Sequence, residues 1–272
     1  MKKSSQLSPP AFLIADSWAG LKRYTDARIA LGRSGVSMPT AAQLAFAQAH
    51  ASARDAVHIP LDVNALRREL EQLSLPSMAL HSQAEDRQTY LQRPDKGRRL
   101  DPPSATMLKT WAAQNPPCDG TIVIADGLSS TAVQRHAAGL CGQLVRALQE
   151  VGLSCSPLCL VEQGRVAIGD EIGELLGAKL MILVVGERPG LSSPDSLGIY
   201  FTFAPRVGLT DARRNCISNI RPAGMKIEDA VARLLWLLQE AIRIGKSGVE
   251  LKDRSGSSDE IQGRSQQNFL LE

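Results

Sequence analysis

The residues best placed for chemistry follow two apolar runs in the second half of the chain. Asp126 comes directly after the run IVIA, and Gly186 and Glu187 come directly after LMILVV. Such runs are typical of strands in a parallel sheet, whose carboxyl ends meet at one edge. A carboxylate at that edge can accept hydrogen bonds from the amides or hydroxyls of a ligand, whereas its burial within a strand would be costly. The alternative is that Glu187 caps nearby backbone or pairs with Arg188.

The segment DGLSST, which contains Ser129, Ser130 and Thr131, is predicted to open a helix after the first of these runs. Its backbone N–H groups could hold an anion, but neither G-x-G-x-x-G nor a Walker A run is present, so helix capping is the favoured interpretation. The serines lack a G-x-S-x-G setting, and the 4 histidines form no triad and no H-E-x-x-H pattern. Hydrolase and zinc-enzyme functions are therefore not supported.

Four cations lie close together in a segment that is rich in proline and glycine, namely Arg93, Lys96, Arg98 and Arg99. They could bind phosphate or a partner's carboxylates, although charged loops are usually only solvated. The net charge of +3 is small against 31 basic and 28 acidic residues, and no aromatic residues alternate with these cations. We therefore expect no nucleic-acid partner.

The cysteine pattern and the lengths of the apolar runs indicate in which cellular compartment the chain works. The 5 cysteines include no C-x-x-C pair, so neither a disulfide framework nor a zinc ribbon is predicted. Cys155 and Cys159 would lie about 13 Å apart on one strand, too far to bind one metal ion. No apolar run approaches the roughly 20 residues that span a bilayer. The apolar core of the N-terminal segment is too short for a signal peptide. We expect no membrane association and a cytoplasmic location.

The N-terminal region, residues 1–100, is predicted to be mostly helical. Leucine and alanine spacing and the available caps favour three helices. Prolines and glycines then predict a loop at residues 90–111, which we interpret as a hinge. The expected helices are 18–31 (cap Asp16 or Ser17), 41–57 (cap Thr40) and 64–73 (cap Asn64).

Residues 101–250 are predicted to form an α/β domain with an open, mainly parallel, Rossmann-like sheet and flanking helices, because continuous apolar runs alternate with amphipathic segments. Gly152 and Gly245 are expected near helix ends. Residues 251–272 are predicted to be a disordered tail. The expected strands are 122–125, 158–161, 180–185 and 199–203, and the expected helices are 133–151, 169–178 and 225–246.

Five segments in register resemble the small (light) subunit of ethanolamine ammonia-lyase, an adenosylcobalamin-dependent enzyme. Each is modest alone, but together they run from Tyr90 to Gly224 over half of the chain and are specific. The segments are YLQRPDKGRRL, VIADGLSS, EQGRVAIGDEIGELLGAK, LVVGERPGLSSPDSLG and RRNCISNIRPAG.

The resemblance implies that residues 101–250 are a cobalamin-binding domain. In the family, cobalamin contacts come from the G-R-V segment, the Glu of V-G-E-R-P-G and the Cys of C-I-S-N-I, which fall here on Val166, Glu187 and Cys216. A corrin ring is a broad apolar plate fringed with amides, which suits a small apolar side chain and a hydrogen-bond acceptor. His136 in QRHAAG is not expected to bind cobalt, since Gln134 stands where the D-x-H-x-x-G motif has its Asp.

The implied activity is the conversion of ethanolamine to acetaldehyde and ammonia by a radical mechanism. A large barrel subunit would carry the substrate site and most catalytic groups, so no catalytic residue and no metal ligand is assigned to this chain. Several small and large pairs would form a hetero-oligomer, and enclosure in a bacterial microcompartment stays open. The alternative is a stand-alone α/β nucleotide-binding or regulatory protein without catalytic activity, which copurification with a larger chain would exclude.

Overall fold

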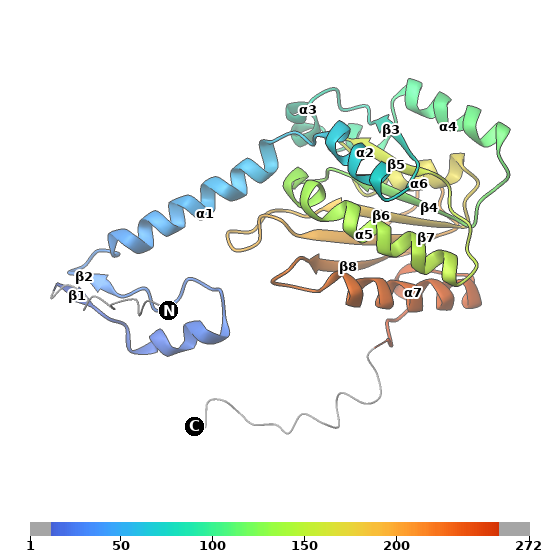
Figure 1. Cartoon of the computed structure of the whole chain (residues 1–272). Coiled ribbons are helices and arrows are strands. Elements are labelled where there is room, and N and C mark those ends of the chain that lie inside the picture. The colour runs from blue at the N-terminus through green and yellow to red at the C-terminus, as the bar shows by residue number, and fades with distance from the viewer. Residues whose placement is uncertain (1–11, 256–272) are drawn as a thin grey trace.

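The computed structural model describes residues 12–255. Its body is a six-stranded sheet between two layers of helices (Figure 1), with strand order β3-β5-β4-β6-β7-β8. The first four strands in this order are parallel, whereas β7 is antiparallel to β6 and β8 is antiparallel to β7. The prediction of an α/β fold with a mainly parallel sheet is therefore confirmed. The strands are β3 (Ser77–His81), β4 (Gly120–Ala125), β5 (Leu158–Glu162), β6 (Leu180–Gly186), β7 (Leu197–Phe203) and β8 (Arg214–Ile220).

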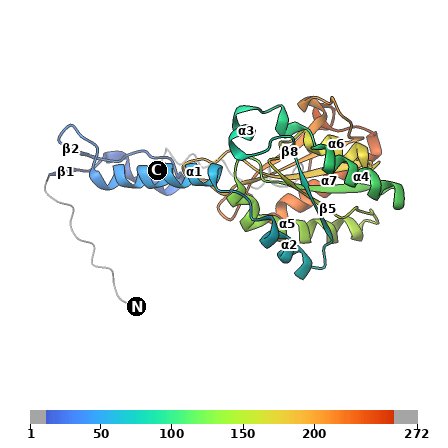
Figure 2. The same cartoon turned by 90° about the horizontal axis from the view of Figure 1, so that it is seen from above.

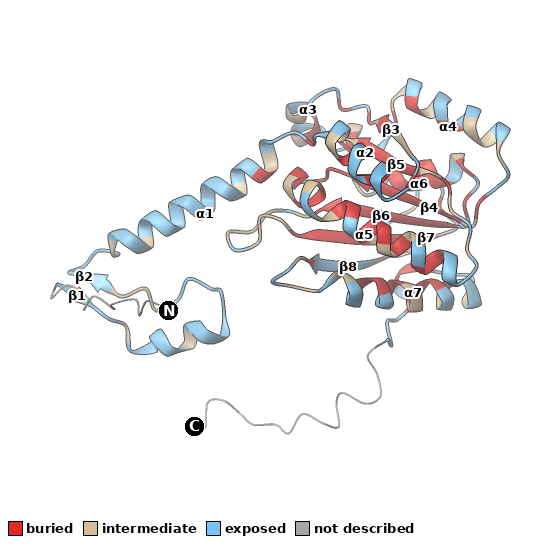
Figure 3. Ribbon diagram, in the orientation of Figure 1, coloured by how far each residue is buried: buried red, intermediate tan, exposed pale blue. Residues whose placement is uncertain are grey.

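The central strands are continuously apolar because helices cover both faces of the sheet. Every residue of β4 and β6 is buried (Figure 3). Leucines and alanines of α5 form the stripe that the spacing predicted, and they pack against one face together with α2 and α7. The other face packs against α4 and α6. The bounds are α2 (Val63–Gln72), α4 (Pro102–Gln114), α5 (Ser130–Glu150), α6 (Ile168–Leu175) and α7 (Ile227–Ile244).

Helix ends follow local hydrogen bonding. Ser129 caps α5, since its side chain accepts from the backbone N–H of Ala132. Gly245 ends α7 with φ +69°, a conformation that suits glycine. Asp62 caps α2 by accepting from the N–H of Ala65, so the prediction that Asn64 would be the cap is wrong.

The predicted loop at residues 90–111 is mostly helical. It contains the end of α3 (Arg87–Gln92), the 3-10 helix η2 (Lys96–Arg98) and most of α4. Pro102 and Pro103 occupy the first turn of α4, where a missing N–H costs nothing, and Asp101 caps that turn. These prolines begin a helix instead of marking a hinge.

The first predicted helix, 18–31, is also shorter than expected. A 3-10 helix, η1 (Ser17–Tyr24), begins after Asp16, whose side chain accepts from the N–H of Trp18 as predicted for a cap. Beyond it, the Thr25 hydroxyl accepts from the N–H of Ala27 and offers the backbone an alternative to the helix.

The N-terminal arm, which we define as residues 12–58, projects from the body (Figures 1 and 2). It contains η1, α1 and a two-stranded sheet, and Ala56 is the only buried residue of α1. Within residues 12–255, no helix is both long and apolar enough to cross a bilayer. Of the predicted tail, Leu251 is buried in the core, and residues 256–272 lie outside the described part. The remaining elements are β1 (Leu13–Ile14), β2 (Arg33–Ser34), α1 (Thr40–His58), η3 (Asp211–Arg213) and η4 (Gly248–Glu250).

Candidate functional site

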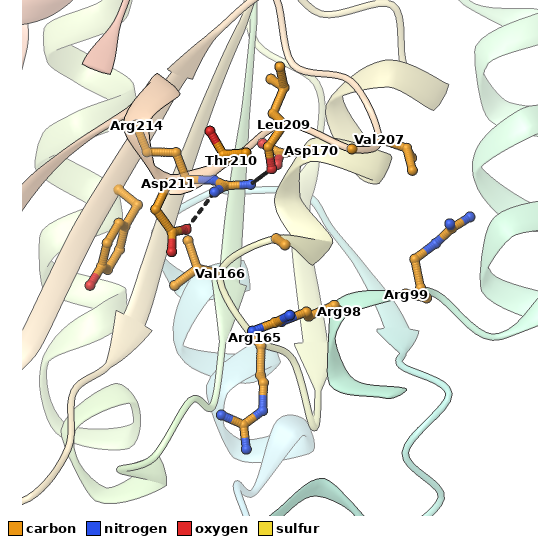
Figure 4. A pocket seen from close by; sticks show the side chains of 13 residues that line it. Arg98, Arg99, Arg165, Val166, Asp170, Val207, Leu209, Thr210, Asp211 and Arg214 are labelled. Atoms are coloured by element: carbon orange, nitrogen blue, oxygen red, sulfur yellow. Dashed lines mark hydrogen bonds and ion pairs between the residues drawn. The ribbon is translucent and has the colours of Figure 1, made fainter. Parts of the chain in front are cut away.

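Two adjoining cavities open beside the carboxyl ends of the parallel strands. The edge cavity, of about 440 Å³, is lined by residues that follow β4, β5 and β6, together with Tyr90 and Tyr200. The arginine cavity, of about 620 Å³, is lined by residues of the β5–α6 and β7–β8 connections and is shown in Figure 4. Arg165, Val166 and Tyr200 line both cavities, so the two form one continuous site.

Val166 lies in the site because a buried carboxylate fixes the loop before it. Asp126 accepts hydrogen bonds from the backbone N–H groups of Gln163 and Gly164, each at 3.0 Å, and its Oδ2 lies 3.4 Å from the Arg87 guanidinium. Burial raises the pKa of Asp126 to about 6, against the opposing effects of Arg87 and these N–H groups. Asp126 itself does not line the edge cavity, since its oxygens bind this loop.

Two glycines allow the β4 and β6 ends to approach closely. Gly127 has φ +58°, and a Cβ there would lie 2.2 Å from the carbonyl oxygen of Gly186. The N–H of Leu128 donates to that same oxygen at 2.9 Å. Glu187 therefore leaves β6 beside the end of β4, at the mouth of the edge cavity.

The two carboxylate oxygens of Glu187 have different surroundings. Oε2 accepts from the Ser196 hydroxyl at 2.6 Å and from the backbone N–H of Asn219 at 3.1 Å. No donor within residues 12–255 reaches Oε1, and a Cβ at Gly198 would lie 2.9 Å from it. The capping alternative thus describes Oε2, whereas Oε1 accepts no hydrogen bond from residues 12–255, and Glu187 forms no ion pair with Arg188 among these residues.

Tyr200 is a site residue that the sequence analysis missed. It stands on β7 directly opposite Cys216 on β8, and its ring lines both cavities. Burial raises the pKa of Tyr200, so its phenol stays neutral. The only available signal was a tyrosine within the apolar run IYFTF, and residue type does not separate a ligand-facing tyrosine from a packed one.

Cys216 lies beside the site and does not line either cavity. It is the only exposed cysteine of the five, whereas Cys118, Cys141 and Cys159 are buried. Cys216 is therefore not a core thiol. Its contact with a cofactor stays a prediction.

The other candidate residues serve the fold. The Ser129 side chain accepts from the N–H of Ala132, which confirms the capping interpretation of DGLSST. The Ser129 hydroxyl also donates to the Pro194 carbonyl at 2.7 Å, and the Ser130 hydroxyl donates to the Ile59 carbonyl. His136 lies on α5 and lines a separate cavity of about 180 Å³. Among residues 12–255, no group of three or more His, Cys, Asp or Glu side chains could hold a metal ion.

The site thus combines apolar walls, one available carboxylate oxygen and arginines along an open sheet edge. The family model for "Ethanolamine ammonia-lyase light chain (EutC)" matches residues 15–252. The chain belongs to this light-chain family. The light-chain match includes most of the N-terminal arm as well as the segments that carry the resemblance, and it makes the chain part of an ammonia-lyase, a carbon–nitrogen lyase.

Curated relatives agree with membership of the light-chain family. The chain is 57% identical over 256 residues to the ethanolamine ammonia-lyase small subunit of Azotobacter vinelandii, and the matched region covers 93% of this chain and 95% of the relative. It is 54% identical over 264 residues to the protein of that name from Ralstonia nicotianae, with 97% of each chain covered. The Pseudomonas syringae pv. tomato small subunit is 52% identical over 266 residues, covering 95% of this chain and 93% of the relative.

Proposed function

We propose that this chain holds one side of adenosylcobalamin in an ethanolamine ammonia-lyase, where a large subunit completes the cofactor site and carries the ethanolamine site. The observation that carries this proposal is that Val166 and Glu187 line one cavity together with Tyr200. Loops after two different strands bring these side chains together. Family membership favours a subunit over a stand-alone nucleotide-binding or regulatory protein.

The chemistry of these residues fits a corrin ring. Val166, Leu128 and the Tyr200 ring offer apolar surface, and Oε1 of Glu187 can accept from a peripheral amide N–H. Cobalamin is several times larger than the ligands that cavities of about 300–1,000 Å³ enclose. The edge cavity, at about 440 Å³, would hold only part of it, so another chain must cover the rest.

The bound cofactor would supply the radical chemistry that converts ethanolamine to acetaldehyde and ammonia. The residues of this chain would bind and orient the cofactor and exclude water from one of its faces. Cys216, beside Tyr200, would contribute a weaker contact at the rim. No catalytic residue is assigned to this chain.

We assign the N-terminal arm to the large-subunit interface. Its exposed apolar side chains include Trp18, Val36, Leu44 and Phe46, and such concentrations mark interaction surfaces. The arm also meets the site, because Arg28 donates to the Leu191 carbonyl at 3.1 Å in the loop that follows Glu187. One large subunit could therefore cover the arm and the cofactor together, in a cytoplasmic assembly of several small and large pairs.

Coexpression with the large subunit of a relative tests the proposal. We expect the two chains to copurify, to bind adenosylcobalamin with the visible spectrum of a base-retained corrinoid, and to release acetaldehyde from ethanolamine. Each chain alone should lack activity. A chain that stays monomeric beside the large subunit and takes up no corrinoid would refute the assignment.

A further inference from the structure

Four arginines line the arginine cavity, but carboxylates neutralise two of them. The Arg99 guanidinium makes two hydrogen bonds of 3.0 Å to Glu171. Arg214 pairs with Asp170 and Asp211, and its side chain is almost fully buried. The guanidinium groups of these two arginines are therefore already paired with carboxylates of the chain and have little capacity to bind an anion.

Arg98 and Arg165 have no carboxylate partner within residues 12–255. The Arg98 side chain makes no hydrogen bond there, and Figure 4 shows it extending toward Arg165, across the cavity from Arg214 and its two carboxylates. The Arg165 side chain donates one hydrogen bond, from Nη2 to the Tyr90 carbonyl at 2.8 Å, and its Nε is buried without a partner. This leaves a positive region on one wall of the cavity.

The positive region is fixed in place. The guanidinium of Arg165 lies 4.4 Å from the centre of the Tyr90 ring, a geometry that holds the cation without neutralising it. The backbone N–H of Arg165 donates to the Gly97 carbonyl at 2.7 Å, which ties the loop of Arg98 to that of Arg165. A Cβ at Gly97 would lie 3.1 Å from both the Arg165 side chain and Tyr90, so the contact is tight.

We propose that Arg98 and Arg165 form a subsite for the phosphodiester of the cobalamin nucleotide loop. This inference rests on the proposed function. The phosphodiester is the one anionic group of cobalamin, whose other peripheral groups are amides, and guanidinium groups suit phosphate oxygens. The subsite adjoins the corrin surface directly, because Arg165 and Val166 are neighbours that line both cavities.

Three corrinoids test this subsite on the complex with the large subunit, by equilibrium dialysis and spectral titration without substrate. Adenosylcobalamin has the phosphodiester and the base, adenosylcobinamide phosphate has a phosphate without the base, and adenosylcobinamide has neither. Arg98→Gln should weaken binding of the first two about tenfold, the effect expected for loss of a charge-assisted hydrogen bond, and leave adenosylcobinamide unchanged. Arg98 is exposed, so the fold should persist.

Further variants separate the subsite from structural effects. Arg165→Gln should show the same selectivity, and Arg98→Lys should recover part of the lost affinity. Arg67→Gln removes an exposed charge on α2 and should change none of the three affinities. Equal losses for all three corrinoids, or no loss for any, would overturn the subsite while cobalamin binding itself still stood. A wild-type complex that bound no corrinoid would instead refute the proposed function, and the subsite with it.

Discussion

At the scale of single residues, Glu187 combines a structural and a ligand-binding role. Its Oε2 accepts hydrogen bonds from the Ser196 hydroxyl and from the backbone N–H of Asn219 near the end of β8, while Oε1 accepts none from residues 12–255 and the residue lines the edge cavity. The fold thereby orients the carboxylate before any ligand arrives. Orienting the acceptor in advance lowers the cost of ordering it on binding.

Glu187→Gln should weaken adenosylcobalamin binding to the complex about tenfold, because an amide N–H₂ at the Oε1 position cannot accept from a cofactor amide and one charge-assisted bond is lost. The carbonyl oxygen of the new side chain can still accept from Ser196, so the fold should persist. Dialysis of the bound corrinoid measures the effect, and Cys216→Ser should change affinity less. Unchanged affinity in the Gln variant would count against Glu187 as a cofactor ligand.

Residue types alone predicted only part of this site. Val166 and Glu187 were assigned from family motifs, and their position on one cavity agrees with that prediction without testing it. Asp126 and Glu187 look equivalent in sequence, since each follows a buried strand. Only the fold shows that Asp126 turns to the backbone of residues 163 and 164, because burial and hydrogen-bond direction depend on which loop packs beside it.

At the scale of elements, the β5–α6 loop depends on Asp126. Asp126→Asn keeps the size of the side chain but turns one acceptor into a donor that faces a backbone N–H. Because a buried hydrogen bond is lost, we expect the free energy of unfolding, measured in urea at pH 7, to fall by about 2 kcal/mol. Cobalamin binding should weaken as well, because Val166 and Arg165 follow this loop. An equally stable variant would show that the loop is held by other contacts.

The stability of the wild type relative to this Asn variant should also depend on pH. The folded-state pKa of Asp126 is raised to about 6 from 3.8, so the folded chain binds the proton more tightly than the unfolded chain. The stability that Asp126 gains from this tighter proton binding is therefore fully present below about pH 4 and is lost as pH rises to about 6. Urea unfolding at pH 4.5 and pH 7 should show a larger wild-type advantage at pH 4.5. An advantage that grows with pH would mean that Arg87 and the two N–H groups outweigh burial.

The elements that sequence reasoning found are those whose burial dominates their pattern. Strands β4, β5 and β6 have helices on both faces, so their runs are apolar without interruption. The unpredicted strands β3 and β8 lie at the two edges of the sheet, where partial exposure mixes polar and apolar residues. Helix α4 was missed because Pro102 looks the same in sequence whether it breaks a chain segment or starts a helix.

At the scale of the whole molecule, the arm differs from the body in what stabilises it. The body buries its apolar residues in two clusters around the sheet, whereas α1, a helix of 19 residues, buries one. Most helical stability in proteins comes from packing of an apolar face, which the body supplies to little of α1. The alanine-rich sequence predicted this helix, but it could not show that the body covers only the part of α1 around Ala56.

If the large subunit covers the arm, Leu44→Glu should weaken assembly of the complex at least tenfold, because a charge would enter an apolar interface. Leu44 is 64% exposed, so the urea unfolding of the isolated chain should change by no more than about 0.5 kcal/mol. Ile242→Glu is the matched control, since Ile242 is 47% exposed on a helix of the body. Sedimentation of mixed subunits measures assembly. Equal losses from both variants, or none from Leu44→Glu, would place the interface elsewhere on the molecule.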